Sequence, residues 1–245
     1  MNLISRLKWK ALNWSLPKPF ECRHIEYSTI SCVDDDPSRP NERLMDISLK
    51  AIDRARKIDL SWISKRMKAG PYWPEIWPGE HYRLLAGLVV VQKPKRVIEI
   101  GTLSGWSALA MAGSLPPGSE LITIDLVPWD QIAATALNPA DFEDGKMRQV
   151  IGDLSDTAFF ASFADTLSGC DLLFVDAPKN VVFEQTLLQH LASIQLPDNA
   201  LVLFDDIRNW NMLKIWRNIT RPKLDLTSFG HWTGTGIIDW NGKLP

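Results

Sequence analysis

The sequence has 245 residues, of which 45% are hydrophobic and 23% charged, and its formal net charge at pH 7 is −2. These values are typical of one soluble globular domain with a sizeable core. They give no support for the strongly basic surface that binds nucleic acid, and no apolar run approaches the roughly 18 residues that cross a bilayer. We therefore expect neither a nucleic-acid partner nor a transmembrane segment.

The N-terminal part of the chain is irregular. Residues 1–14 mix Lys8 and Lys10 with leucines, and these charges interrupt the unbroken apolar core that a signal peptide needs. Two interpretations stay open: a weak interfacial helix, or a helix packed on its own domain or on a partner. From about Glu42 to Met67, apolar residues at helical spacing predict a helix, which Gly70-Pro71 ends. We assign residues 1–75 to an N-terminal extension and residues 76–245 to the main domain.

The cysteines bear on the cellular compartment. Cys22, Cys32 and Cys170 are odd in number and scattered, without C-x-x-C spacing, which argues against a disulfide framework or a zinc site. Cys170 begins an apolar run and is expected to be buried. A reducing, cytoplasmic environment is the expectation.

Short apolar runs then alternate with helical stretches, as in a parallel sheet covered on both faces. The predicted strands are Arg96–Ile100, Glu120–Asp125, Met147–Ile151, Leu172–Asp176 and Ala200–Phe204. The predicted helices are Ser107–Gly113, Asp156–Asp165, Val182–Ile194 and Asn209–Asn218. Two last strands, Leu224–Phe229 and Thr235–Asp239, lie too close together for a helical crossover and should pair as an antiparallel hairpin.

This order predicts an α/β fold with a Rossmann-like doubly wound sheet, mostly parallel, with a C-terminal antiparallel hairpin. A dehydrogenase-type sheet would normally add a sixth parallel strand instead. In open α/β sheets, ligands bind beyond the carboxyl ends of the strands, so the residues that follow each strand are the candidates for function.

The turn after the first strand carries Glu99, Gly101, Gly105 and Ser107. Glycines there permit a tight turn and a close approach of a ligand, and the helix that follows offers free N–H groups to an anion. The spacing is GxxxG and differs from the GxGxxG of dinucleotide-binding proteins.

Acidic residues follow the next two strands. Asp125 could accept hydrogen bonds from a ribose diol, with a helix N-cap as the alternative. Asp153 follows the third strand, and either an adenine amino group or the cap of the next helix fits it.

The fourth and fifth strands end in Asp176, followed by Lys179, and in Asp205-Asp206. Three carboxylates at neighbouring strand ends repel one another unless a cation neutralises them, and hard oxygen ligands suit Mg²⁺. Helix capping is the alternative for these aspartates, and a surface turn is the alternative for Lys179.

Together these motifs resemble those of the catechol and caffeoyl-CoA type O-methyltransferases, a branch of the class I S-adenosylmethionine-dependent methyltransferases. That family carries E-x-G-x-x-x-G-[YW]-S, an acid after the second strand, D-x-x-K after the fourth and D-[ND] after the fifth. The match runs in order from about Gly79 to Asp206.

The resemblance implies S-adenosylmethionine as cofactor and a hydroxylated small molecule as substrate. It implies that the methionine half of the cofactor lies against Glu99, Gly101, Gly105 and Ser107, the ribose against Asp125 and the adenine near Asp153. It also implies Mg²⁺ or another divalent cation on Asp176, Asp205 and Asp206. Lys179 would then be the base, acting beside Asp176, with its pKa lowered by the metal.

The sequence departs from the family in two places. Asp206 stands where Asn is usual, which adds negative charge, and Pro178 is uncommon within D-x-x-K. The first 75 or so residues align with nothing in the family. A homodimer is expected from the resemblance and from the apolar N-terminal segment.

Two other functions remain open: a metal-independent methyltransferase, and a non-catalytic cofactor-binding module. A nicotinamide dehydrogenase is disfavoured by the absence of GxGxxG.

The four histidines show no ligand spacing; His190 is expected to be structural, and His231 is a weak candidate in the terminal hairpin. Among eleven tryptophans, packing is the favoured role for each one taken singly.

Overall fold

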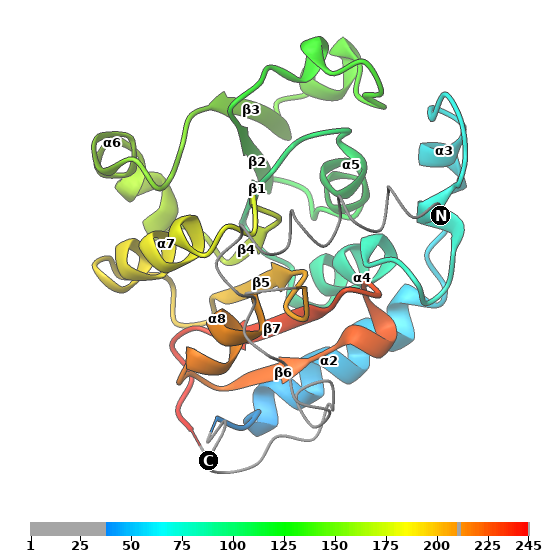
Figure 1. Ribbon diagram of the computed structural model, residues 1–245. Helices are drawn as coiled ribbons and strands as arrows, with labels where there is room; N and C mark the ends of the chain where they lie inside the picture. Colours follow the sequence, from blue (N-terminus) through cyan, green and yellow to red (C-terminus); the bar gives the residue numbers. More distant parts are fainter. Residues whose placement is uncertain (1–37, 210–211, 245) are drawn as a thin grey trace, which may run out of the picture.

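The computed structural model describes residues 38–209 and 212–244. Within these residues, seven strands form one sheet in the order β3-β2-β1-β4-β5-β7-β6 (Figure 1). The strands are β1 (Arg96–Ile100), β2 (Glu120–Asp125), β3 (Met147–Ile151), β4 (Leu172–Val175), β5 (Leu201–Asp205), β6 (Lys223–Asp225) and β7 (Thr235–Asp239). The predictions for residues 1–37, which include Cys22 and Cys32, lie outside the described residues.

Helices connect and cover these strands. The α-helices are α2 (Glu42–Ala55), α3 (Ser61–Ser64), α4 (Tyr82–Gln92), α5 (Trp106–Ala112), α6 (Thr157–Ser168), α7 (Val182–Ala192) and α8 (Met212–Asn218). Short 3₁₀ turns are η2 (Trp73–Glu75), η3 (Trp129–Gln131), η4 (Pro139–Phe142) and η5 (Thr227–Phe229).

The predicted fold class is confirmed. Strands β1 to β5 pair in parallel, and β7 runs antiparallel to both β5 and β6. One apolar cluster joins α6, α7 and α8 to one face of the sheet, and a second joins α2, α4 and α5 to the other face (Figure 1). The result is the layered arrangement that short buried parallel strands require.

Several predicted bounds differ from the structure by a few residues, and two elements differ more strongly. The helix expected from Glu42 to Met67 divides into α2, which ends at Ala55, and α3; where α3 begins, the Asp59 side chain accepts the backbone N–H of Ser61 at 2.9 Å. The strand expected to reach Phe229 ends at Asp225, whose Oδ1 accepts the N–H of Thr227 at 2.9 Å and begins η5. In both places a short acidic side chain competes with the regular backbone ladder.

Helix α4 had no counterpart in the sequence-based prediction. It is apolar on nearly all sides, and residues Leu84 to Val89 are all buried. A Cβ on Gly87 would lie 2.5 Å from the backbone oxygen of Ala51, so α2 and α4 pack with their backbones close together. The buried Leu44 and Ala51 of α2 share an apolar cluster with Val97 of β1.

Within the described residues, no helix combines the length and apolarity needed to span a membrane.

The register of the strands places the functional edge. Ile100 pairs with Ile124 on one side and with Val175 on the other, and Val175 pairs with Phe204. The next residue on each strand is therefore level with its neighbours, which brings Gly101, Asp125, Asp176 and Asp205 to one row at the carboxyl edge of the sheet.

Candidate active site

A pocket of about 360 Å³ opens at this edge. Its volume is within the range of small-molecule sites. It is lined by Ile100, Gly101, Leu103, Ile124, Asp125, Leu126, Gly152, Asp153, Leu154, Asp176, Ala177, Pro178, Lys179 and Phe183. Five residues singled out from the sequence thus share one pocket: Gly101, Asp125, Asp153, Asp176 and Lys179.

The first turn is tight because it is built on glycines. Gly101 has φ +102°, and a Cβ there would lie 2.2 Å from the backbone oxygen of Asp176. Gly105 has φ +77°, precedes α5, and has no room for a Cβ beside Leu137. Gly105 and Ser107 do not line the pocket; they shape the turn that does.

Glu99 lies in β1 and is fully buried, outside the pocket lining. Its Oε2 accepts a hydrogen bond from Thr123 Oγ1 at 2.6 Å. Burial raises the pKa of Glu99 to about 8, although hydrogen bonds with Ser107 and Thr123 oppose the rise. The carboxyl group therefore stays protonated well above the pH at which a glutamate ordinarily ionises.

Asp125 ties two loops together. Its Oδ2 accepts the backbone N–H of Leu103 at 2.9 Å, and its Oδ1 accepts those of Leu126 at 2.7 Å and Val127 at 3.2 Å. No α-helix begins at this point, so the helix-cap alternative does not hold for Asp125.

Asp153 has a local contact as well as a position on the pocket. Its Oδ1 accepts the N–H of Ser155 at 2.8 Å and the hydroxyl of the same residue at 2.7 Å. The N-cap of α6 is Asp156, which accepts the N–H of Phe159 at 2.7 Å. The capping role considered for Asp153 therefore belongs to Asp156.

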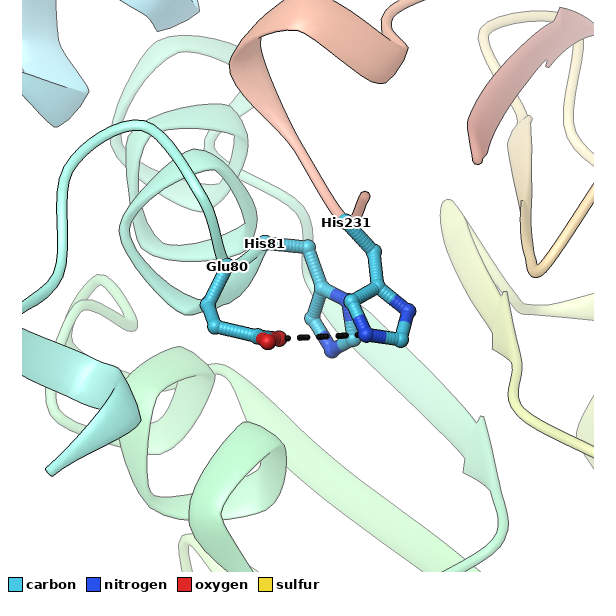
Figure 2. Close-up of side chains that lie close together, drawn as sticks. All are labelled: Glu80, His81 and His231. Atoms are coloured by element: carbon cyan, nitrogen blue, oxygen red, sulfur yellow. Dashed lines mark ion pairs between the residues drawn. The ribbon is translucent and has the colours of Figure 1, made fainter. Parts of the chain in front are cut away.

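Glu80, His81 and His231 lie close together, although His231 is far from the other two in the sequence (Figure 2). Glu80 Oε2 is 3.5 Å from His231 Nε2, and the two imidazole rings meet edge to face with centroids 5.3 Å apart. Glu80 and His81 precede α4, whereas His231 precedes β7. His231 was a weak candidate, and nothing in the sequence pointed to the other two.

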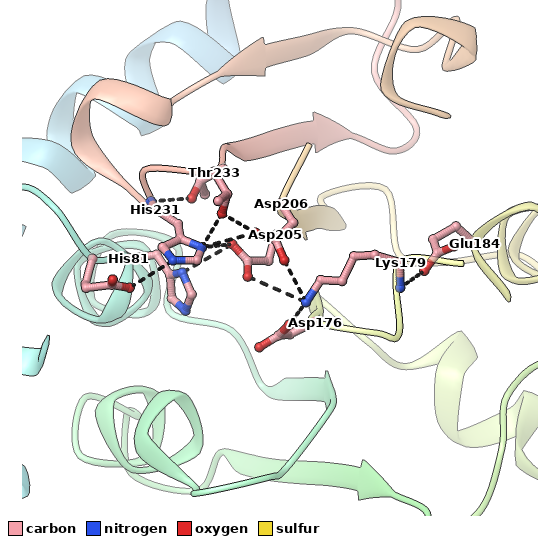
Figure 3. Close-up of polar contacts among 10 residues, drawn as sticks. His81, Asp176, Lys179, Glu184, Asp205, Asp206, His231 and Thr233 are labelled. Carbon is pink, nitrogen blue, oxygen red and sulfur yellow. Dashed lines mark hydrogen bonds and ion pairs between the residues drawn. The ribbon is translucent and has the colours of Figure 1, made fainter. Parts of the chain in front are cut away.

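The three aspartates after β4 and β5 converge on Lys179 (Figure 3). Lys179 Nζ donates to Asp176 Oδ1 and lies 3.0 Å from Asp206 Oδ2 and 3.9 Å from Asp205 Oδ2. Burial, together with the charge of Asp205, raises the pKa of Asp176. Burial opposes the charge of Lys179, but the carboxylates outweigh it and raise the pKa of its amine above the usual value.

Lys179 is not a free surface lysine, since its side chain is only 19% exposed. Its backbone has φ +58°, and that of Val181 has φ +74°. The buried carboxylate of Glu184 accepts the N–H of Lys179 at 2.9 Å (Figure 3). It also accepts the N–H of Val181 at 2.7 Å. These two bonds hold an otherwise unfavourable loop in place and direct the amine at the aspartates.

Both histidines face the acidic pair. His231 Nδ1 is 3.1 Å from Asp205 Oδ1 and 3.4 Å from Asp206 Oδ1, and His81 Nδ1 is 3.4 Å from Asp205 Oδ1 (Figure 3). Burial disfavours a charged ring, but hydrogen bonds to Asp205 and Asp206 raise the pKa of His231 to about 10. Burial alone would raise the pKa of Asp205, yet the two histidines lower it.

Other predicted residues have packing roles. His190 Nδ1 is 3.0 Å from the Leu154 oxygen, and its ring stacks on Phe160 at 4.3 Å. Cys170 is buried, which raises the pKa of its thiol to about 12. Trp129 stacks on Phe142, and Trp216 is buried in the core. Trp210 lies outside the described residues.

Known proteins with similar sequences include several O-methyltransferases. Among curated relatives, the human "Transmembrane O-methyltransferase" is 31% identical over 127 residues, which cover 51% of this chain and 43% of that protein. The "Catechol O-methyltransferase" of Mycobacterium tuberculosis is 34% identical over 112 residues, covering 44% of this chain and 46% of that protein. The chain thus aligns with less than half the length of these relatives.

Among solved structures, an O-methyltransferase from Bacillus cereus in complex with SAH has a TM-score of 0.50 and 17% identity. The similarity covers 76% of this chain and 89% of that one, and it is a similarity of fold. A family model described as O-methyltransferase matches residues 66–203, more than half of the chain. The family resemblance seen in the motifs is therefore confirmed, and the chain belongs to the O-methyltransferase family.

Proposed function

We propose that this protein transfers the methyl group of S-adenosylmethionine to a hydroxyl group of a small molecule. The observation that carries the proposal is the pocket, which joins the Gly101 turn and Asp125 to Asp176 and Lys179. The first pair suits a nucleoside-like cofactor, and the second suits an ionisable hydroxyl.

The cofactor half of the pocket combines polar and apolar groups. Asp125 offers a carboxylate to a ribose diol, and Asp153 lies on the same wall for an adenine amino group. Leu103 and Leu126 line the pocket and are 63% and 66% exposed, so a flat purine ring could cover them. Glu99, Gly105 and Ser107 support the turn on the methionine side.

The transfer itself is an in-line displacement. The substrate oxygen forms a bond to the methyl carbon while the carbon–sulfur bond breaks, and the hydroxyl proton passes to a base. Alignment of the two reactants can supply about 7–11 kcal/mol of the barrier in favourable cases. The hydrogen bonds from the loop at Lys179 to the buried Glu184 fix the amine for such alignment.

Lys179 is placed to receive the proton, but it must first lose its own. The aspartates oppose that loss, because they raise the pKa of Lys179. A divalent cation would lower the pKa of the amine and of a coordinated hydroxyl. As the sequence predicted, Asp176, Asp205 and Asp206 would hold this cation; their clustered oxygens have the donor chemistry that Mg²⁺ prefers.

A metal-independent transfer is the second candidate. Lys179 contacts Asp176 and Asp206 and approaches Asp205, so the protein already supplies a cation to these carboxylates. In that case the protonated amine orients the substrate oxygen, and a substrate that is already ionised needs no base.

The test is transfer of a labelled methyl group from S-adenosylmethionine to a panel of catechols and other small hydroxylated compounds, with and without a chelator. Asp176→Asn should abolish a metal-dependent transfer, whereas Asp165→Asn, at an exposed position of α6, should not alter it. Transfer that survives the chelator supports the metal-independent reaction. Cofactor binding without transfer to any compound would favour the non-catalytic module.

A homodimer and a cytoplasmic location remain predictions. Sedimentation of the full chain at several concentrations tests the first.

A further inference from the structure

A second group of metal-ligating side chains lies on the far side of Asp205 from Lys179. Asp205 Oδ2 is directed at Lys179, and its Oδ1 is directed at His81 and His231. Glu80 joins the two histidines on that side (Figure 2). One ligand atom from each of Glu80, His81 and His231 lies within 4.8 Å of the others.

His81 is the unusual member of this group. It is 3% exposed, and within the described part of the chain neither ring nitrogen has a hydrogen-bond partner. A buried polar group without a partner is destabilising, so native proteins nearly always provide one. His81 is held in place by Phe174 and Tyr82, with ring centroids 5.2 Å and 4.7 Å away. The ring is therefore fixed in place; its Nδ1 faces Asp205 Oδ1 at 3.4 Å, and its Nε2 has no partner among the described residues.

His231 is arranged like a metal-bound histidine whose second ring nitrogen is hydrogen-bonded to a carboxylate. Its Nδ1 lies 3.1 Å from Asp205 Oδ1 and 2.8 Å from Thr233 Oγ1, while Nε2 faces Glu80. Metal-bound histidines typically donate the second ring N–H to a carboxylate, which fixes the tautomer and the ring orientation. Asp205 stands in that position for His231, and its Oδ1 is also 3.4 Å from His81 Nδ1.

We propose that Glu80, His81 and His231 bind a divalent transition-metal ion, with Asp205 as the outer carboxylate that orients both histidines. Two imidazoles and one carboxylate suit zinc, cobalt, nickel or ferrous iron, whereas Mg²⁺ and Ca²⁺ prefer oxygen ligands alone. Metal–ligand bonds of about 2.0–2.2 Å place the ligand atoms about 3–4 Å apart, so the observed group needs only a small contraction. Three protein ligands leave positions for water or a substrate oxygen.

The competing explanation needs no metal. Two protonated histidines could balance Glu80, Asp205 and Asp206 as a buried ion-pair network. The two explanations differ in the roles of Glu80 and His81 Nε2, because only a metal site requires both as ligands.

Cobalt(II) distinguishes the two, because its visible absorption reports nitrogen and oxygen coordination. The full chain, freed of metal by a chelator, is titrated with Co²⁺ in the absence of S-adenosylmethionine. We expect one ion per chain, retained in excess Mg²⁺. Glu80→Gln, His81→Gln and His231→Gln should each weaken binding at least tenfold, with circular dichroism showing that each variant is folded.

Two control variants locate the ion. His190→Gln removes a histidine that packs on Phe160, and Asp176→Asn removes a carboxylate on the Lys179 side; both should bind Co²⁺ as the parent does. No Co²⁺ binding, or equal binding by the parent and the three ligand variants, would overturn the proposal. Loss in Asp176→Asn alone would place the ion among the aspartates and overturn it too.

The outcome is independent of the methyltransferase activity. Co²⁺ binding is measured without cofactor or substrate, so a metal site can be present in a protein that transfers no methyl group. Conversely, methyl transfer with no Co²⁺ site would leave the proposed function intact and remove only this inference.

Discussion

Gly101 gives the sharpest test of how the pocket is built. Its φ of +102° is a conformation that L side chains rarely adopt, and an added Cβ would lie 2.2 Å from the backbone oxygen of Asp176. Because the clash is with the main chain of a central strand end, a side-chain rotation cannot relieve it. Gly101→Ala therefore combines backbone strain with overpacking.

The magnitude follows from these two effects. A left-handed conformation costs a residue with a Cβ about 1–2 kcal/mol, and overpacking adds about 1–3 kcal/mol. We expect Gly101→Ala to lower the free energy of unfolding by about 2–5 kcal/mol. Gly118 is the matched control: its φ is +78°, but a Cβ there would meet nothing within 4 Å. Gly118→Ala should cost only the backbone strain, about 1–2 kcal/mol.

Urea unfolding followed by tryptophan fluorescence measures both variants, since the chain has eleven tryptophans. With a slope of about 2 kcal/mol per molar urea, the two midpoints should differ by about 0.5–1.5 M. Gly101→Ala should also weaken binding of S-adenosylmethionine, and Gly118→Ala should not. Equal midpoints for the two variants would refute the close approach of Gly101 to Asp176.

Three further predictions concern buried polar groups. The folded protein keeps the proton of Glu99 up to about pH 8, while the unfolded chain loses it near pH 4.5, so the free energy of unfolding falls between these pH values by as much as about 5 kcal/mol. Urea titrations across this pH range should show the fall in the parent protein and not in Glu99→Gln. Identical pH profiles of the two proteins would contradict the raised pKa of Glu99. Glu184→Ala leaves the N–H groups of Lys179 and Val181 without their acceptor and should lower stability by about 2–4 kcal/mol, measured by thermal unfolding against the exposed Gln185→Ala control. Lys223→Met removes an amine that donates to three main-chain oxygens at the end of α8, at 2.5, 3.2 and 2.8 Å. The free energy of unfolding measured in urea should fall by about 2–3 kcal/mol. An unchanged midpoint would show that these hydrogen bonds do not contribute to stability.

The strands and their order could be predicted because apolar runs and turn residues are local properties. The bounds of β1, β2, β3 and β7 are those predicted from the sequence. Helix α4 was missed because a helix buried on nearly all sides has no polar face to reveal its period. The break between α2 and α3 was missed because apolar residues keep a helical spacing through it, while the Asp59 side chain accepts the backbone N–H of Ser61 where α3 begins.

Some residues of the candidate site could be predicted from the sequence and others could not. Asp125, Asp176 and Asp205 lie at the carboxyl ends of parallel strands whose register is regular, so their convergence could be predicted from the sequence. Glu80 and His81 come from the connection before α4, and His231 comes from the connection before β7. These two connections meet only because β7 inserts between β5 and β6, a pairing that the predicted hairpin did not contain.

The central claim is that the pocket at the carboxyl edge binds S-adenosylmethionine through Asp125. Calorimetric titration of the full chain with the cofactor tests it most directly, with Asp125→Asn as the variant and Asp156→Asn, which preserves the cap of α6, as the matched control. We expect one site per chain, affinity reduced at least tenfold in Asp125→Asn and unchanged affinity in Asp156→Asn. The absence of binding, or equal binding by all three proteins, would contradict it.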